Sequence, residues 1–261
     1  ILSFNIESEN ELSRLSMVAA EMKKIAPVAI IFKPNVDAGV HEFTKTGRKS
    51  DKFGVSIEAA KDLVKKCSNS ASLKLVGLTC HIGSQIMELK GFEDAAKQAL
   101  ELLIEIDRLN INLDFIDMGG GLGVNYVGEE TVQPFELIES YEKIFAGRNE
   151  RLILEPGRSI SANAGIMLTK VEYKKNDFLI ADAAMNDLLR PALYQAHHDV
   201  WPVRKTHNAT SNVSLVGPIC ETGDFLAKNI DIEGSEGDLL AVRTVGAYGF
   251  VMSSNYNSRP R

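Results

Sequence analysis

The alternation of short apolar runs with helical patterns is the feature that most constrains this chain of 261 residues. Apolar runs occupy residues 2–6, 28–32, 73–80, 115–118 and 152–154, and a helical pattern lies between each consecutive pair. Strands that alternate with helices in this way favour a parallel sheet with helices packed outside it. We therefore predict an α/β fold for residues 1–163.

The helical patterns carry their own start and end signals. Ser8 and Glu11 match a capping box at the start of the first helix. Pro134 suits the first turn of the fourth helix, predicted over residues 135–145, and Gly147 suits its end. The predicted buried stripes are Leu12, Leu15, Val18 and Met22 in the first helix, Ile57, Ala60, Leu63, Val64 and Cys67 in the second, and Phe92, Ala96, Ala99, Leu103 and Ile106 in the third.

The pattern changes after about residue 164. Strands are predicted at residues 166–173, 178–182, 213–219 and 239–245, and the one helical stretch, residues 186–198, is interrupted by Pro191. We therefore predict a mainly β C-terminal domain over residues 164–261. A closed β/α barrel has eight strands and typically about 250 residues. The five strands before it predict the later part of such a barrel, and we expect roughly three strand–helix units upstream.

Composition removes several classes of function. The net charge is −6, whereas nucleic-acid-binding domains are usually basic, so we expect no nucleic-acid partner. Apolar runs stay far below about 18 residues, so we expect no membrane span. Three cysteines without C-x-x-C spacing favour a reducing, cytoplasmic location over a disulfide framework or a zinc site. The pair His197 and His198 lacks the spacing of metal ligands, and we expect no metal.

Three predicted strands end in polar or glycine-rich motifs. Residues 119–121 are three consecutive glycines after the run 115–118, a pattern that fits either an anion held by backbone N–H groups or a tight turn. Glu155-Pro156-Gly157-Arg158 fits either a ligand site or a surface ion pair, and His81 with Ser84 fits either a ligand contact or a structural role. Active sites of parallel barrels gather at the carboxyl ends of the strands, which favours the ligand interpretations.

Further candidate residues lie in the second half of the chain. Arg190 and Tyr194 are one helical turn apart and share a face if this segment is helical. Cys220 and Glu221 lie in the glycine-rich segment 217–224, and Tyr248 lies between two glycines. Each of these patterns alone is also typical of a polar loop.

Taken in order, the motifs resemble the diaminopimelate decarboxylase family, whose members are pyridoxal-phosphate enzymes with the alanine-racemase-like fold. The resemblance implies a β/α barrel followed by a mainly β domain. It also implies a homodimer in which the segment with Cys220 and Glu221 reaches the active site of the partner subunit. The matching segments are residues 5–8, 34–37, 46–54, 80–85, 119–123, 155–158, 186–194, 217–224 and 246–261.

The resemblance assigns roles around pyridoxal 5'-phosphate. A carboxylate at Glu155 keeps the pyridine nitrogen protonated, so that the ring accepts the electrons left by departing CO2. Cys220 corresponds to the proton donor, and a thiol is a credible acid near neutral pH. The other implied contacts are Gly119, Gly120, Gly121, Arg158 and Ser84 at the phosphate, His81 against the ring, Pro156 and Gly157 in the same cofactor motif, and Tyr248 at cofactor and substrate.

The resemblance also implies the substrate. The compound meso-2,6-diaminopimelate carries a second amino-acid end that ornithine, arginine and lysine lack, and a carboxylate there is best held by a guanidinium. The implied substrate-holding residues are Arg158, Arg190, Tyr194, Glu221 and Tyr248. The implied reaction gives L-lysine and CO2, the last step of lysine biosynthesis. The alternative is a related decarboxylase of ornithine, arginine or a polyamine precursor.

Two departures of the sequence from the family concern the cofactor. The lysine that binds the cofactor covalently lies in a Tyr-Ala-x-Lys-Ala-Asn-like segment, which this chain lacks. We expect that lysine upstream and this chain alone to be inactive. The alternative is a non-catalytic homologue without the lysine. In addition, Ile31 and Lys33 stand where the family usually has Arg and Asn before a proline.

Overall fold

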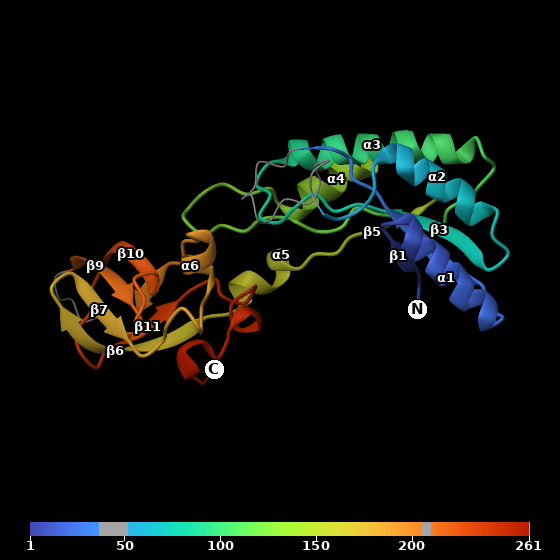
Figure 1. Ribbon diagram of the computed structural model, residues 1–261. Helices are drawn as coiled ribbons and strands as arrows, with labels where there is room; N and C mark the ends of the chain where they lie inside the picture. The colour runs from blue at the N-terminus through green and yellow to red at the C-terminus, as the bar shows by residue number, and fades with distance from the viewer. Residues whose placement is uncertain (37–51, 205–209, 261) are drawn as a thin grey trace. The chain divides into compact units, whose positions relative to one another are not determined.

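The computed structural model describes residues 1–36, 52–204 and 210–260 (Figure 1). The chain forms two compact units, each described below by itself. Unit 1 comprises Ile1–Gly123 and Thr131–Pro156, and unit 2 comprises Val124–Glu130 and Gly157–Arg261. Of the motif segments noted above, Asp37, residues 46–51 and Arg261 lie outside the described residues.

Unit 1 is built on a five-stranded parallel sheet in which the strand order follows the chain, β1-β2-β3-β4-β5. The strands are β1 (Phe4–Ile6), β2 (Ala26–Ile31), β3 (Leu73–Thr79), β4 (Phe115–Asp117) and β5 (Arg151–Ile153). The connecting helices are α1 (Glu9–Glu21), α2 (Ile57–Ser68), α3 (Leu89–Asp107) and α4 (Pro134–Ile144). The predicted α/β architecture, part of a barrel-like fold, is confirmed.

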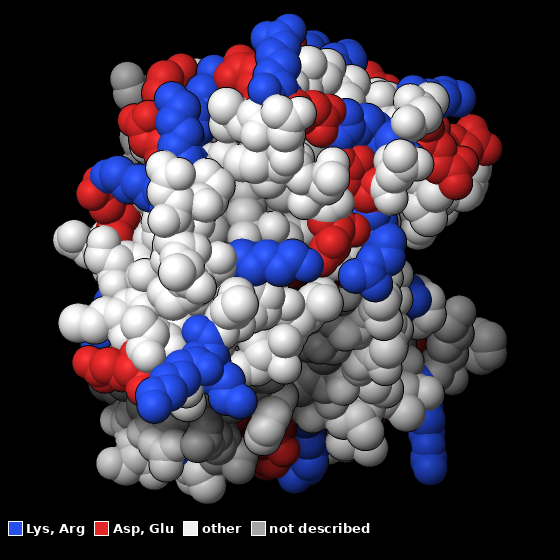
Figure 2. All heavy atoms as spheres, turned by 90° about the vertical axis from the view of Figure 1, so that its right-hand side faces the viewer, with Lys and Arg blue, Asp and Glu red and all other residues white. Residues whose placement is uncertain are grey.

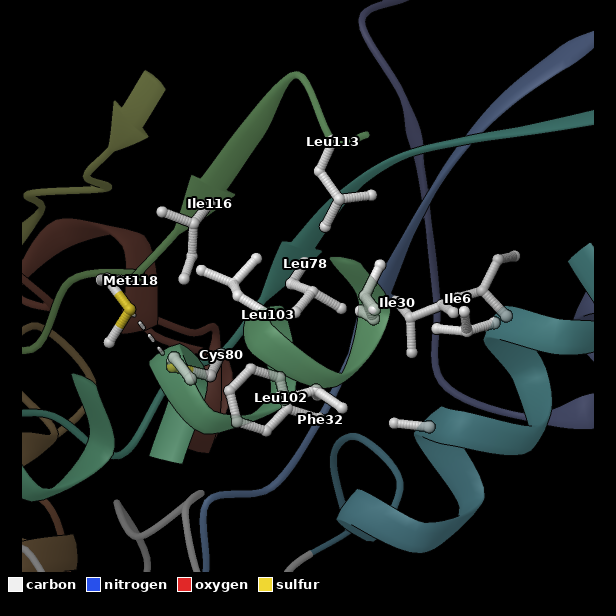
Figure 3. Close-up of a cluster of buried hydrophobic side chains, with 14 of the residues drawn as sticks. Ile6, Ile30, Phe32, Leu78, Cys80, Leu102, Leu103, Leu113, Ile116 and Met118 are labelled. Atoms are coloured by element: carbon white, nitrogen blue, oxygen red, sulfur yellow. Dashed lines mark hydrogen bonds between the residues drawn. The ribbon is translucent and has the colours of Figure 1, made fainter. Parts of the chain in front are cut away.

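The register of the sheet lines up its apolar side chains. Ile6 is opposite Ile30, Ile30 is opposite Leu78, and Leu78 is opposite Ile116. Figure 3 shows these four side chains in a row across the sheet, beside Leu102 and Leu103 of α3. Complete burial of such a side chain stabilises the fold by roughly 1.5–3 kcal/mol. This row therefore fixes the sheet beneath the helices.

The helices of unit 1 confirm most of the predicted stripes. The stripe of α3 is fully buried, and in α2 only Ile57 is partly exposed. Pro134 begins α4, with a capping box formed by Gln133 and Glu136. In α1, Ser8 accepts a hydrogen bond from the Glu11 N–H at 3.2 Å, as predicted. The Glu11 carboxylate, however, accepts from the backbone of Glu7 rather than from that of Ser8.

The predicted stripe of α1 is wrong in its second half. Val18 and Met22 are 40% and 65% exposed, whereas Ala19 is buried together with Leu12. The buried positions follow the i, i+3, i+7 spacing through Leu15, which packs partly against the core. Several spacings are compatible with an apolar-rich helix, and only the packing against the sheet selects one of them.

Unit 2 contains a six-stranded mixed sheet in the order β10-β9-β7-β6-β11-β8. Only the pair β7 and β9 is parallel. The strands are β6 (Met167–Lys175), β7 (Phe178–Ala181), β8 (Val200–Pro202), β9 (Ser211–Val216), β10 (Phe225–Ile232) and β11 (Leu239–Val242). Its core includes Val171, Leu179, Leu215, Leu226 and Leu240. The predicted mainly β character is confirmed, although β8 and β10 were not predicted.

Short helical pieces precede the first of these strands, lie between β7 and β8, and follow the last strand. They are α5 (Arg158–Ser161), η2 (Ala162–Ala164), α6 (Arg190–Tyr194), η3 (Phe250–Met252) and η4 (Tyr256–Ser258). The helix predicted over residues 186–198 is therefore much shorter. Pro191 lies in the first turn of α6, where its missing N–H costs nothing, so it begins the helix instead of interrupting it. Gln195, with φ of +53°, ends it.

The outer face of the molecule drawn in Figure 2 carries lysine, arginine and acidic side chains in alternation rather than in patches of one sign. Ion pairs join neighbouring helices of unit 1, including Lys61 of α2 with Glu105 of α3 at 2.7 Å and Lys66 of α2 with Glu9 of α1. Among the described residues, no helix is long and apolar enough to cross a membrane. The same residues include no cluster of three His, Cys, Asp or Glu placed for a metal.

Candidate active site

The carboxyl ends of β3, β4 and β5 are tied together just beyond the strands. The Cys80 N–H donates to the Asp117 carbonyl at 2.9 Å, and the Met118 N–H donates to the Ile153 carbonyl at 3.1 Å. The Glu155 N–H then donates to the Gly119 carbonyl at 2.8 Å. These bonds bring the predicted residues of unit 1 to one edge of the sheet: His81, the glycines at 119–121, and Glu155.

The three glycines are required by close backbone approach. A Cβ on Gly120 would lie 2.2 Å from the Glu155 carbonyl oxygen, and one on Gly121 would lie 2.4 Å from that of Gly83. Gly119 has φ of +66°, and its Cβ would lie 2.7 Å from the Cys80 carbonyl oxygen. Any other residue would therefore push the loop away from its neighbours.

Two of the three glycine N–H groups are already engaged. The Gly119 N–H donates to the Asp117 carboxylate at 2.8 Å, and the Gly120 N–H donates to Nδ1 of His81 at 3.3 Å. In the described part of the chain, no group accepts from the Gly121 N–H. Ser84 belongs to the segment that packs on this loop, where the Ile86 N–H donates to the Gly121 carbonyl.

Asp117, the last residue of β4, adds a carboxyl group that the sequence analysis did not single out. It is buried and forms a side-chain hydrogen bond with Glu155, which is exposed. Burial raises the pKa of Asp117 to about 6, the Gly119 N–H opposes this, and the negative charge of Glu155 adds to it. Two carboxyl groups in contact share a proton more readily than either holds one alone.

His81 is a neutral ring at this edge. Its Nδ1 accepts from Gly120, so the proton of the neutral ring is on Nε2. Burial lowers the pKa of His81 below its usual value, and the Glu155 carboxylate opposes that shift. Unit 1 thus presents an uncharged imidazole beside an acidic pair.

Unit 2 holds Arg158 in a buried position at the start of α5. Its guanidinium donates to the Tyr126 hydroxyl at 2.8 Å, and its Cζ lies 4.9 Å from the ring centre of Tyr248. The structure therefore brings Arg158 and Tyr248 together, as predicted for one site. Pro156 ends unit 1 and Gly157 begins this part of unit 2, and both are exposed.

Arg190 is buried close to Arg158, and the positive charge of Arg158 acts on it. Its Cζ lies 4.8 Å from the ring centre of Tyr126, and one NH group lies 2.8 Å from Nε2 of His198. Tyr194 follows one turn later on α6 and is half-buried. Burial lowers the pKa of His198 to about 4, so this imidazole is neutral near pH 7.

Cys220 and Glu221 lie exposed in a turn that Asp224 holds in place. The buried Asp224 carboxylate accepts from the N–H groups of Ile219 and Met185, at 2.8 and 2.6 Å. Glu221 accepts from the Tyr256 hydroxyl, and this bond raises the pKa of Tyr256. Within the described residues of this one chain, no hydrogen bond or ion pair joins Glu221 to Arg190.

Comparison with known proteins identifies the family. Residues 1–162 match the pyridoxal-binding domain of pyridoxal-dependent decarboxylases, and residues 114–246 match the C-terminal sheet domain of the same enzymes. The chain belongs to the pyridoxal-dependent decarboxylase family.

Relatives within this decarboxylase family are diaminopimelate decarboxylases. The enzyme of Pseudomonas aeruginosa is 50% identical over 99% of this chain, and that of Vibrio cholerae is 46% identical over the whole chain. The chain spans 63% and 64% of their lengths. The crystal structure of the Helicobacter pylori enzyme with L-lysine is 39% identical, with a TM-score of 0.97 over all of this chain and 66% of that one.

The residues at the edge of unit 1 fit the cofactor of the decarboxylase family. The Glu155 carboxylate suits a protonated pyridine nitrogen, and the uncharged His81 suits an aromatic neighbour. The Gly121 N–H is available to a phosphate oxygen. The loop that presents it keeps its shape only with glycine, because a Cβ at each of the three positions would meet a carbonyl oxygen within 2.7 Å.

Sequence reasoning missed Asp117, Tyr126 and His198 as candidate functional residues. A carboxylate at the end of an otherwise apolar strand was the available signal for Asp117. An aromatic residue in a polar loop was the signal for Tyr126. His198 was considered only as a metal ligand, and its contact with Arg190 has no signature in the sequence.

Proposed function

We propose that the whole protein converts meso-2,6-diaminopimelate to L-lysine and CO2 with pyridoxal phosphate, as the last step of lysine biosynthesis. The identity to diaminopimelate decarboxylases supports this, as does the relative whose structure contains L-lysine. The observation that carries the proposal is Arg190. It is a buried guanidinium without a carboxylate partner among the described residues, which suits a substrate with a second carboxylate.

The proposed division of labour follows the two domains predicted from the sequence. Residues 1–163 would bind the cofactor and residues 164–261 would complete the active site. Ser84, Gly119, Gly120, Gly121 and Arg158 would surround the phosphate, with the Gly121 N–H as the available donor of the loop. Glu155 would hold a proton at the pyridine nitrogen, and Pro156 and Gly157 would set its position. His81 would pack against the ring.

The bound cofactor supplies the acceptor for the electron pair left when CO2 departs. The reaction breaks one C–C bond, releases CO2 and adds one proton at the same carbon. Cys220 would give that proton from its thiol and regain one from water. Arg190, Tyr194, Glu221 and Tyr248 would hold the amino-acid end that does not react, a carboxylate against guanidinium and an ammonium against carboxylate.

The test of the substrate uses the full-length protein loaded with pyridoxal phosphate. We expect CO2 release and lysine formation from meso-diaminopimelate, with ornithine, arginine and lysine slower by orders of magnitude. CO2 release from ornithine or arginine instead would refute the substrate assignment and favour the related decarboxylases. A correctly folded full-length protein that acts on none of these substrates would refute the enzymatic assignment altogether.

We also propose a homodimer with shared active sites, in which the turn with Cys220 and Glu221 serves the partner subunit. The exposure of this turn supports the proposal. Equal amounts of Cys220→Ala and Arg190→Ala subunits, mixed and reassociated, should regain about a quarter of the wild-type activity, because half the dimers carry one intact site. Activity no higher than that of the separate variants would refute it.

The proposed location is the cytoplasm. Cys67, Cys80 and Cys220 are free thiols, as expected of a reducing compartment. Cell fractionation with an antibody against the full-length protein tests this directly.

A further inference from the structure

His198 is one of the least exposed polar side chains described in unit 2, and both of its ring nitrogens have hydrogen-bond partners. It is 1% exposed. Its Nδ1 lies 2.9 Å from the Arg243 carbonyl, which only accepts, so Nδ1 carries the proton. Nε2 is then unprotonated and accepts from the Arg190 guanidinium at 2.8 Å. A backbone carbonyl thus fixes the tautomer in which His198 is a neutral acceptor for Arg190.

Tyr126 is the second partner of Arg190, and it is also uncharged. Its ring centre lies 4.8 Å from the Arg190 Cζ, and its edge meets the ring of His198 at 5.3 Å with an interplanar angle of 84°. Its hydroxyl accepts from Arg158. Tyr126 therefore contacts both guanidiniums and neutralises neither.

The charge of Arg190 is consequently uncompensated. It is 6% exposed, its Nε has no hydrogen-bond partner, and no ion pair to an acidic residue exists for it within the described ranges. Burial lowers the pKa of Arg190, and the like charge of Arg158 adds to this. Buried charges in proteins are normally paired, so this arrangement is costly until an anion arrives.

Another arginine, Arg148, shows how the charge of a largely buried arginine is usually paired. Arg148, in unit 1, donates to the carboxylates of Asp107 and Glu150, whose two negative charges more than offset its own. An arginine with only a structural task is thus held by acids in this chain. Arg190 is held just as specifically, but by an imidazole and a phenol ring.

We propose that His198 is a positioning residue for substrate: with Tyr126, it holds Arg190 through neutral contacts so that the guanidinium keeps its full charge for the carboxylate at the non-reacting end. This rests on the proposed function, in which Arg190 recognises that carboxylate. The essential property of residue 198 is therefore an acceptor without charge.

Glutamine and glutamate form the matched pair for the test, because they have the same shape and differ in charge. The probe is pimelate, which has both carboxylates of the proposed substrate and no amino group, added to the cofactor-free full-length protein. His198→Gln should bind pimelate within about threefold of wild type, and His198→Glu at least about tenfold more weakly, as judged by the rise in melting temperature. Without pimelate, His198→Glu should melt no lower than His198→Gln, since its carboxylate pairs with Arg190.

A merely structural role for His198 would change both variants alike. In the loaded enzyme, we expect the same tenfold difference in KM for meso-diaminopimelate, with kcat within about threefold. Equal pimelate affinity in the two variants, high or low, would overturn the inference. Decarboxylation of meso-diaminopimelate by the wild-type enzyme is judged separately, so a failure of the proposed function is distinguishable from a failure of this one.

A second pair serves if the His198 variants do not unfold cooperatively. Tyr126→Phe keeps a ring at Arg190 and should bind pimelate within about threefold of wild type. Tyr126→Leu removes the ring and should bind about tenfold more weakly. Equal affinities in this pair would also contradict the neutral-contact arrangement.

Discussion

The carboxyl edge of unit 1 collects two acids, whereas unit 2 buries two guanidiniums. Asp117 and Glu155 share a hydrogen bond at the end of β4 and β5. Arg158 and Arg190 lie around Tyr126 in unit 2. A neutral histidine lies beside each group: His81 in unit 1 and His198 in unit 2. The candidate residues of unit 1 are therefore mainly acidic, and those of unit 2 are mainly basic.

The pKa values express the same contrast. Burial raises the pKa of Asp117 to about 6 and lowers that of His198 to about 4. In both cases burial favours the neutral form of the side chain.

Removal of Arg190 should eliminate one of the two buried guanidiniums of unit 2 and weaken substrate binding. Arg190→Ala is expected to lower kcat/KM for meso-diaminopimelate by about 100-fold or more, because charge-assisted hydrogen bonds are worth roughly 1.5–3 kcal/mol each and tenfold corresponds to about 1.4 kcal/mol. Arg204→Ala, which removes an exposed positive charge of unit 2, is the control and should change kcat/KM by less than about twofold. Equal effects would mean that overall charge, not position, attracts the substrate.

The loop of residues 119–121 is hydrogen-bonded to both Asp117 and Glu155, and Gly119→Ala should disrupt this loop. Gly147→Ala is the matched control, since Gly147 has φ of +80° in open space whereas Gly119 has φ of +66° against the Cys80 carbonyl. The left-handed backbone costs both variants about 1 kcal/mol. The contact at 2.7 Å should cost Gly119→Ala a further 1–3 kcal/mol or so in urea unfolding. Equal losses would show that the loop yields easily.

Asp117→Asn should change how the stability of the protein depends on pH. The native pKa of about 6 lies above the ordinary value of 3.8, so the native state binds the extra proton and the stabilising effect is lost as pH rises through 6. Asparagine stays neutral, so the variant should be more stable than wild type by up to about 3 kcal/mol at pH 8 and equal to it below about pH 4. Thermal melts of the cofactor-free protein across this range provide the measurement. A wild-type advantage at pH 8 would contradict the shared-proton arrangement.

The smallest effect is expected at the helical surface, where charges of both signs alternate (Figure 2). Lys61→Ala removes the ion pair with Glu105 and should change the free energy of unfolding by at most about 0.5 kcal/mol. Denaturant midpoints would show it, and a loss above about 1 kcal/mol would mean that surface pairs matter here as much as the buried charges.

The sequence predicted best what depends on regular spacing. The stripes of α2 and α3 and the five parallel strands follow directly from the apolar pattern. The strand β10 was not predicted from the sequence. Its register shifts between Ala227 and Ile230, and Asn229 has φ of +52°, so its side chains do not alternate regularly between the two faces. The strand β8 has only three residues and ends at Pro202, too few to show any period.

Site residues followed a similar rule. Residues within motifs, such as Glu155 and Gly121, were predictable because neighbours in sequence identify them. Asp117 and His198 could not be identified in this way, because they stand out only through contacts made by the fold. Asp117 contacts Glu155, which is 38 residues away in the sequence, and His198 contacts Arg190, which is 8 residues away. A sequence shows that such residues exist, whereas only the fold shows which group each one meets.

The excursion of residues 124–130 into unit 2 limits how modular the protein is. The chain leaves unit 1 after Gly123, returns at Thr131 and leaves again after Pro156. A chimera joined at Pro156 would therefore inherit Tyr126 from one parent and Arg158, Arg190 and His198 from the other. Relatives that differ at these positions cannot exchange their halves independently, so residues 124–130 must change together with Arg158, Arg190 and His198 during evolution or design.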